Sequence, residues 1–160
     1  MPVYHLTLHA YRSWRPDHPK GYTRRGEGYQ PPDPEVAEQY DERATEEPAV
    51  FTLEVQRIII RTTHDFCARR KYRFHGSGND DSHTHLLLSW RGFSSWHEVM
   101  RRLKNVLSLE LNRQLNCKRK WFVRGGSRKQ VKNRAHLERL LKKYFPDHPG
   151  ICWREGAALP

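Results

Sequence analysis

The most strand-like segment of the chain is residues 82–90, which read Ser-His-Thr-His-Leu-Leu-Leu-Ser-Trp. Its apolar run from Leu86 to Leu88 predicts a buried central strand, because short apolar runs of this kind are typical of sheet cores. His83 and His85 open the strand two positions apart, so both rings project from one face and can share a metal ion. A polar pair on a sheet surface has the same spacing, and the rest of the chain must decide between these interpretations.

Periodicity and turn signals around this strand predict an α+β fold. The further predicted strands are residues 3–11, 71–76, 121–123 and 151–153, and the predicted helices are residues 34–43, 48–70, 94–116 and 133–144. Turns are expected at 76–81 and, as a flexible basic segment, at 124–129. The alternating order of elements predicts one domain over residues 1–160, a sandwich in which helices pack on an antiparallel-rich sheet.

Residues 12–48 form a long excursion from this pattern, rich in Pro, Gly and acidic side chains. Asp33 and Pro34 are typical of a helix start, which predicts the short helix within it. The acidic part, residues 35–47, is expected to cover the basic face of the protein when no polyanion is bound.

The composition excludes several classes of protein. Of the 160 residues 36% are hydrophobic, and the apolar runs are far shorter than the roughly 18 residues that span a bilayer. The N-terminus has no signal-peptide pattern, so a cytoplasmic location is expected. The odd number of widely spaced cysteines, Cys67, Cys117 and Cys152, argues against a disulfide framework or a structural zinc site.

The positive charge is concentrated in one part of the chain. The net charge is +11, and residues 91–160 hold 17 of the 29 Lys and Arg but only five of the 18 Asp and Glu. Such clustering favours a nucleic-acid partner, because cations gain free energy by releasing counterions from phosphate backbones.

The order of motifs resembles the single-tyrosine HUH transposases, and among them the REP-associated tyrosine transposases. The resemblance rests on the opening strand with Tyr4-His5-Leu6-Thr7, the segment from Trp14 to Gly21, the strand that begins Ser82-His83-Thr84-His85, the amphipathic helix that follows, and a C-terminal helix with Tyr144. It implies an HUH-type fold, which is a ferredoxin-like or RRM-like sandwich with the His-x-His strand at its centre. Thr84 departs from the usual apolar residue between the histidines, and Pro146 interrupts the helix after Tyr144.

The resemblance implies a metal-dependent DNA nicking and joining enzyme. Tyr144 would be the nucleophile that forms a 5′-phosphotyrosine, and His83, His85 and His148 would hold Mg²⁺ or Mn²⁺. Because Pro146 lies between Tyr144 and His148, Asp147, Asp80 and Asp81 are alternative third ligands. The implied setting is the bacterial cytoplasm, in association with the nucleoid.

The implied substrate is single-stranded DNA, with a hairpin as the recognised structure, bound by a monomer or a homodimer. The candidate nucleic-acid-binding residues are Arg101, Arg102, Lys104, Lys118, Arg119, Lys120, Trp121, Arg124, Arg128, Lys129, Lys132, Lys142 and Lys143. Trp121, Phe122 and Trp96 are candidates for stacking on bases.

Two other functions fit the same residues. A non-catalytic single-stranded DNA or RNA binding protein would use the basic surface without the histidines and Tyr144. A metal-dependent phosphodiesterase would use the histidines to activate water and would not need Tyr144.

Overall fold

A five-stranded antiparallel sheet forms the centre of the computed structural model, which describes residues 1–24 and 26–160. Its strands are β1 (Val3–His9), β4 (Arg73–Asn79), β5 (His83–Ser89), β6 (Ser127–Gln130) and β7 (Cys152–Arg154). The strand order is β6-β1-β5-β4-β7, so β5 lies in the middle of the sheet, between β1 and β4.

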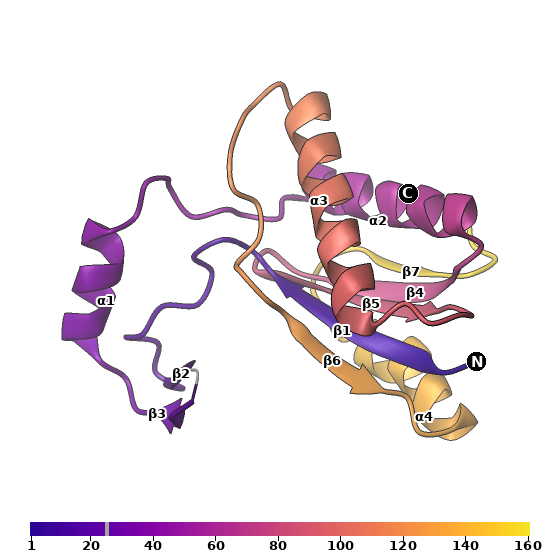
Figure 1. Cartoon of the computed structure of the whole chain (residues 1–160), viewed down its shortest axis with the longest axis horizontal. Helices are drawn as coiled ribbons and strands as arrows, with labels where there is room; N and C mark the ends of the chain where they lie inside the picture. Colours follow the sequence, from indigo (N-terminus) through magenta and orange to yellow (C-terminus); the bar gives the residue numbers. More distant parts are fainter. Residues whose placement is uncertain (25) are drawn as a thin grey trace.

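Helices cover both faces of this sheet (Figure 1). The helices α2 (Leu53–Arg70) and α3 (Trp96–Gln114) pack on one face, and α4 (Arg134–Arg139) with the π-helical turn η1 (Leu140–Tyr144) packs on the other. In chain order the sandwich reads β1-α2-β4-β5-α3-β6, and its four strands lie in the order β6-β1-β5-β4, which is the ferredoxin-like arrangement. The predicted α+β fold class is therefore confirmed.

The main hydrophobic core lies between the sheet and the pair α2 and α3. Leu6 and Leu8 of β1 and Leu86 and Leu88 of β5 are fully buried there. A smaller cluster on the opposite face joins Leu87 to Leu140 and Phe145. Because side chains alternate along a strand, β5 supplies leucines to both clusters.

Two helix starts follow from side-chain caps. The side chain of Ser95 accepts from the backbone N–H of Glu98, and the Glu98 carboxylate accepts from Ser95, which is the predicted capping box of α3. The α2 prediction began too early, at residue 48. Thr52 caps α2 instead, and the fully buried Phe51 enters the core in extended chain before it.

The predicted turn at residues 76–81 is wrong over residues 76–79, because β4 continues to Asn79. A Cβ on Gly76 would lie 2.5 Å from a Leu141 methyl carbon, and one on Gly78 would lie 2.9 Å from the Cα of Phe145. These glycines let η1 and the residue after it approach the strand closely, so they are packing residues and not turn residues.

Residues 121–130 also differ from the prediction. The segment 121–123 forms only an isolated bridge between Ala10 and Phe122, and the predicted basic turn contains β6. All four residues of β6 are exposed at the sheet edge, where they pair with β1. An edge strand of this kind lacks the apolar alternation that reveals a strand in sequence.

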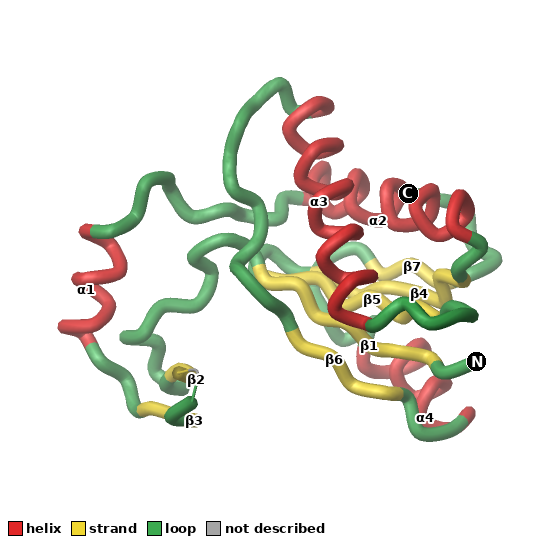
Figure 2. Tube along the Cα trace, viewed as in Figure 1, coloured by secondary structure: helices red, strands yellow, loops and turns green. Residues whose placement is uncertain are grey.

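The excursion at residues 12–48 lies beside the sandwich and adds no strand to its sheet (Figures 1 and 2). It contains the two-stranded ribbon of β2 (Tyr22–Arg24) and β3 (Gly28–Gln30), followed by α1 (Pro34–Glu42). Asp33 caps α1 as predicted, through its side chain and the N–H of Val36. Within the described residues, no helix has the length and apolar character needed to cross a membrane.

Candidate active site

The central strand β5 presents His83 and His85 on the sheet face that α4 and η1 cover. Leu86 and Leu88 point to the opposite face, into the main core. Thr84, between the two histidines, is fully buried and donates its hydroxyl proton to Asn79 Oδ1 at 2.5 Å. The strand thus holds both imidazoles at fixed positions on one face.

His148 joins this pair although Pro146 lies between it and Tyr144. The chain widens into a π-helical turn, in which the N–H of Phe145 donates to the carbonyl of Leu140, five residues back. The N–H of His148 then donates to the carbonyl of Phe145, and one ring nitrogen from each of His83, His85 and His148 lies within 4.8 Å of the others. The three predicted histidines are therefore brought together; Asp147, Asp80 and Asp81 do not belong to this group.

Each of the three rings makes a hydrogen bond through Nδ1. His148 Nδ1 lies 2.8 Å from the Tyr144 carbonyl, and His83 Nδ1 lies 2.9 Å from Asp80 Oδ2. A carbonyl and a carboxylate can only accept, so these Nδ1 atoms carry a proton, and Nε2 is the nitrogen of each ring that could bind a metal ion. His85 Nδ1 lies 2.9 Å from Thr7 Oγ1, which directs its Nε2 toward the same space.

The carboxylate of Asp80 holds the ring of His83 in position. One carboxylate oxygen accepts from the backbone N–H groups of Ser82 and His83, each at 2.7 Å, and from the Ser82 hydroxyl. Burial raises the pKa of this carboxyl, but these hydrogen bonds outweigh burial and the net pKa is lowered. The carboxylate is therefore charged and holds the His83 ring in place.

The environment keeps His83 and His85 neutral. Burial, with the neighbouring His5 and His83, lowers the pKa of His85 to about 2. Burial also lowers the pKa of His83, although Asp80 opposes this shift. Neutral imidazoles are the form that binds a metal ion.

Tyr144 places its phenolic oxygen 3.3 Å from His85 Nε2. The side chain is 41% exposed, so the hydroxyl group can be reached from solvent. Burial, followed by the negative charge of Asp80, raises the pKa of Tyr144 above its ordinary value. A cation beside the hydroxyl would favour the phenolate.

Two residues of β1 belong to this site but were not assigned to it from the sequence. Thr7 pairs with His85 across the sheet, and His5 Nε2 lies 2.9 Å from His85 Nδ1. Burial lowers the pKa of His5 to about 4. The signal was present in the alternation of residues 3–11, which places His5, Thr7 and His9 on one face.

The predicted nucleic-acid-binding residues fall into two groups. The first group lies near Tyr144: Lys129 and Lys143 line a pocket beside it, and Lys132 lines the adjoining pocket. Lys142 also lies on η1, but its ammonium group forms an ion pair with Glu138 at 3.1 Å. Arg128 points to the other face of β6, where its guanidinium lies over the rings of Tyr4 and Trp96.

The second group lies elsewhere on the surface, and several of its residues form hydrogen bonds or ion pairs within the protein. Lys104 donates to the carbonyls of Val123 and Gly125, and Arg119 donates to the carbonyl of Glu47. The Lys120 N–H donates to Glu46, so the end of the acidic excursion does contact part of the basic segment. Arg101, Lys118 and Arg124 are exposed, and Arg102 lies 3.9 Å from Glu98.

Two of the three aromatic candidates for base stacking face inward. Trp121 is 5% exposed and donates its indole N–H to Asn112, and Phe122 packs edge-on against Phe51. Trp96 is half-buried and stacks on His97.

Comparison with solved structures gives a distant likeness. A solved structure, described as a REP-associated tyrosine transposase bound to a REP hairpin, is 12% identical with a TM-score of 0.43, over 86% of this chain. The chain covers 60% of the length of that transposase. No protein-family model and no curated relative matches the chain.

Proposed function

We propose that this chain is a metal-dependent enzyme that nicks and rejoins single-stranded DNA through a 5′-phosphotyrosine at Tyr144. The observation that supports this most strongly is the position of the Tyr144 hydroxyl, 3.3 Å from His85 Nε2, beside three convergent histidines. A hydroxyl nucleophile next to a candidate metal centre is one arrangement that can carry out phosphoryl transfer to a protein side chain.

The donor set fits a divalent ion. Three imidazoles converge on one space, and Nδ1 of each is held by Asp80, Thr7 or the Tyr144 carbonyl. His83, His85 and His148 would hold Mg²⁺ or Mn²⁺, and such an ion would polarise the scissile phosphate. Imidazole ligands suit Mn²⁺ better than Mg²⁺, which prefers oxygen.

Tyr144 would lose its proton to solvent through the exposed side of the ring, and its oxygen would attack phosphorus. The bond to the Tyr144 oxygen forms while the bond between phosphorus and the 3′-oxygen breaks, and that oxygen leaves as a hydroxyl after taking a proton. The phosphodiester energy stays in the phosphotyrosine, so a second 3′-hydroxyl can reverse the step and join strands.

The positive charge of the surface near Tyr144 supports single-stranded DNA as the substrate. Lys129, Lys132 and Lys143 provide positive charge there, and an unpaired strand can bend into a site that a rigid duplex cannot enter. The same proposal includes a hairpin beside the cleaved strand and a monomer or homodimer as the active unit. It also includes a bacterial cytoplasmic location near the nucleoid and the treatment of residues 1–160 as one domain.

A nicking assay with matched variants tests this function. Wild-type protein with Mn²⁺ should nick a single-stranded hairpin oligonucleotide, and Tyr144→Phe should lower the rate at least 10³-fold while Tyr40→Phe, at an exposed tyrosine of α1, leaves it unchanged. Full nicking by Tyr144→Phe would favour a phosphodiesterase that activates water. Binding without nicking by the wild type would favour a non-catalytic binding protein.

A further inference from the structure

A pocket of about 350 Å³ lies beside Tyr144 and is lined mainly by residues outside the histidine centre. Its walls come from β1, β6, α4 and η1. Leu140 and the Tyr144 ring supply apolar surface, and Lys129, Arg139 and Lys143 supply positive charge. The reactive hydroxyl group therefore borders a cationic cavity of the size that binds small ligands.

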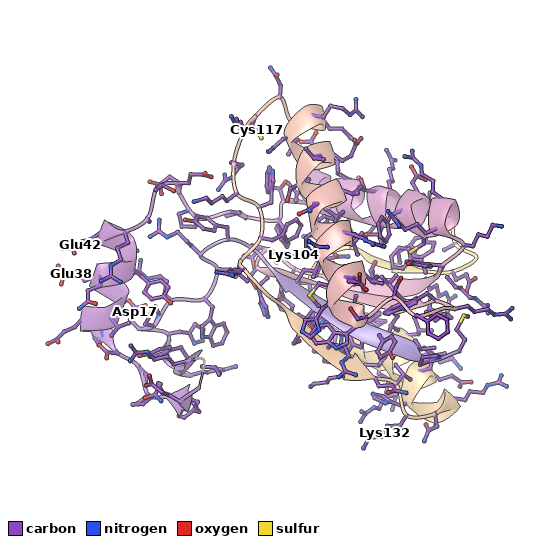
Figure 3. The ribbon with its side chains drawn as sticks, in the orientation of Figure 1. Asp17, Glu38, Glu42, Lys104, Cys117 and Lys132 are labelled. Atoms are coloured by element: carbon purple, nitrogen blue, oxygen red, sulfur yellow. The ribbon has the colours of Figure 1, made fainter. Side chains whose placement is uncertain are left out.

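This pocket continues into a second one along α4. The second pocket, of about 340 Å³, includes Lys132 and shares His136 and Arg139 with the first. Lys132 lies beside α4 at the border of the molecule (Figure 3). We name the two pockets together the α4 groove. A groove of two joined cavities suits an extended ligand that runs past Tyr144.

The charges of the α4 groove are not neutralised by neighbouring residues. On α4, Glu138 pairs with Arg134 and Lys142. Within the described part of the chain, none of Lys129, Lys132, Arg139 and Lys143 forms an ion pair, and Asp147 is the one carboxylate of the lining. Four unpaired cations against one carboxylate favour a polyanion.

We propose that the α4 groove binds the unpaired nucleotides next to the phosphate that Tyr144 attacks. Phosphate groups lie against Lys129, Lys132, Arg139 and Lys143, and a base packs on the exposed part of the Tyr144 ring. The proposal rests on the proposed function for the role of Tyr144, but the binding itself is independent of cleavage. It assigns the contacts near the reacting bond to the segment from β6 to η1, and not to the basic segment 118–120.

Binding can be measured without cleavage in a Tyr144→Phe background with EDTA, using a fluorescent oligonucleotide of ten thymidines. Arg139→Ala and Lys143→Ala should each raise Kd by about three- to tenfold and reduce the salt slope by about 0.7, the value for one lost phosphate contact. Lys20→Ala, which removes an equal charge from an exposed site outside the groove and outside the candidate DNA-binding residues, should change Kd less than twofold. Equal effects of all three variants would overturn the proposal.

Two further measurements test the contact of a DNA base with the groove and the effect of the Asp147 carboxylate on DNA binding. An oligonucleotide of ten abasic units should bind at least fivefold more weakly, because stacking contributes to each base contact. Asp147→Asn should tighten binding about two- to threefold, since it removes the one negative charge of the groove. An unchanged or weakened affinity of Asp147→Asn, or equal binding of the abasic strand, would contradict the assignment.

The two proposals fail in different ways. If wild-type protein forms a covalent adduct with DNA but the groove variants leave affinity and adduct yield unchanged, the groove is wrong and the function stands. If no adduct forms but the groove variants weaken binding as expected, the function is wrong and the groove stands.

Discussion

The hydroxyl oxygen of Tyr144 lies 3.3 Å from Nε2 of His85, although the two residues are 59 positions apart in the chain. The π-helical turn η1 carries one of them and the central strand β5 carries the other. The packing of η1 on the sheet thus holds the hydroxyl group of Tyr144 beside an atom of the candidate metal centre.

Asp80→Asn should weaken metal binding without removing a ligand. The carboxylate accepts from His83 Nδ1 and fixes its ring, and losing such a partner typically costs about 10- to 100-fold in metal affinity. Isothermal titration with Mn²⁺ measures the effect. Asp81→Asn, at the exposed neighbouring position, is the control and should keep wild-type affinity. If Asp81→Asn also loses affinity, or Asp80→Asn loses all binding, the assignment of Asp80 is wrong.

Gly78→Ala should displace Tyr144 from the histidines. The added Cβ would lie 2.9 Å from the Cα and Cβ of Phe145, so the residue after Tyr144 must move. We expect a loss of about 1–3 kcal/mol in the free energy of unfolding and a much larger relative loss of nicking. Urea denaturation and the nicking assay measure the two effects.

Ser77→Ala is the matched control for that variant. The buried Ser77 hydroxyl finds no hydrogen-bond partner among the described residues, so its removal should be neutral or slightly stabilising. Nicking should stay at the wild-type level. A Gly78→Ala protein that nicks as well as Ser77→Ala would show that Tyr144 does not need its observed position.

Stability should fall as the pH is lowered from 7 to 5. Burial lowers the pKa of His5 to about 4, so below about pH 6.5 the unfolded chain takes up this proton before the folded protein does. At pH 5 this one group costs about 2 kcal/mol. Urea denaturation at several pH values measures the slope.

His75, which lies outside the candidate metal centre, provides a second test of how the free energy of unfolding depends on pH. Burial, with Arg73 next, lowers the pKa of His75 against the opposing effect of Glu155, and the ring hydrogen-bonds Ser89 at 2.7 Å. His75→Gln keeps a polar partner for Ser89 and should flatten the pH dependence, whereas His97→Gln, at an exposed position, should not. Identical slopes in both variants would contradict the stated cause.

Mn²⁺ should bind at least tenfold more tightly than Mg²⁺. The convergent donors are the imidazole nitrogens of His83, His85 and His148, and nitrogen donors favour Mn²⁺ over the oxygen-seeking Mg²⁺. Competition titrations with wild-type protein measure the ratio. Equal affinities would indicate that carboxylate oxygens dominate the site.

The central part of the fold could be predicted because its sequence signals are local. Three local signals predict elements that the structure contains. They are the apolar run of β5, the capping box at Ser95 and the helix cap at Asp33. The histidine pair could be placed on one face for the same reason, since alternation along a strand needs no tertiary information.

The errors arose where packing overrides local preference. Gly76 and Gly78 are typical of a turn in sequence, but here they make room for Leu141 and Phe145 against a strand. The exposed edge strand β6 has no apolar pattern to detect. His148 reaches the histidine pair through a five-residue turn before Pro146, a geometry that an α-helical register does not contain.

The most direct test of the whole account is the mass of the tyrosine-containing peptide after reaction with DNA. Wild-type protein is incubated with Mn²⁺ and single-stranded hairpin oligonucleotides, denatured in SDS, digested and analysed by mass spectrometry. We expect a 5′-linked nucleotide on Tyr144, absent in Tyr144→Phe and in His85→Ala. An adduct on another residue, or its absence with every hairpin while the DNA is still bound, would contradict the account.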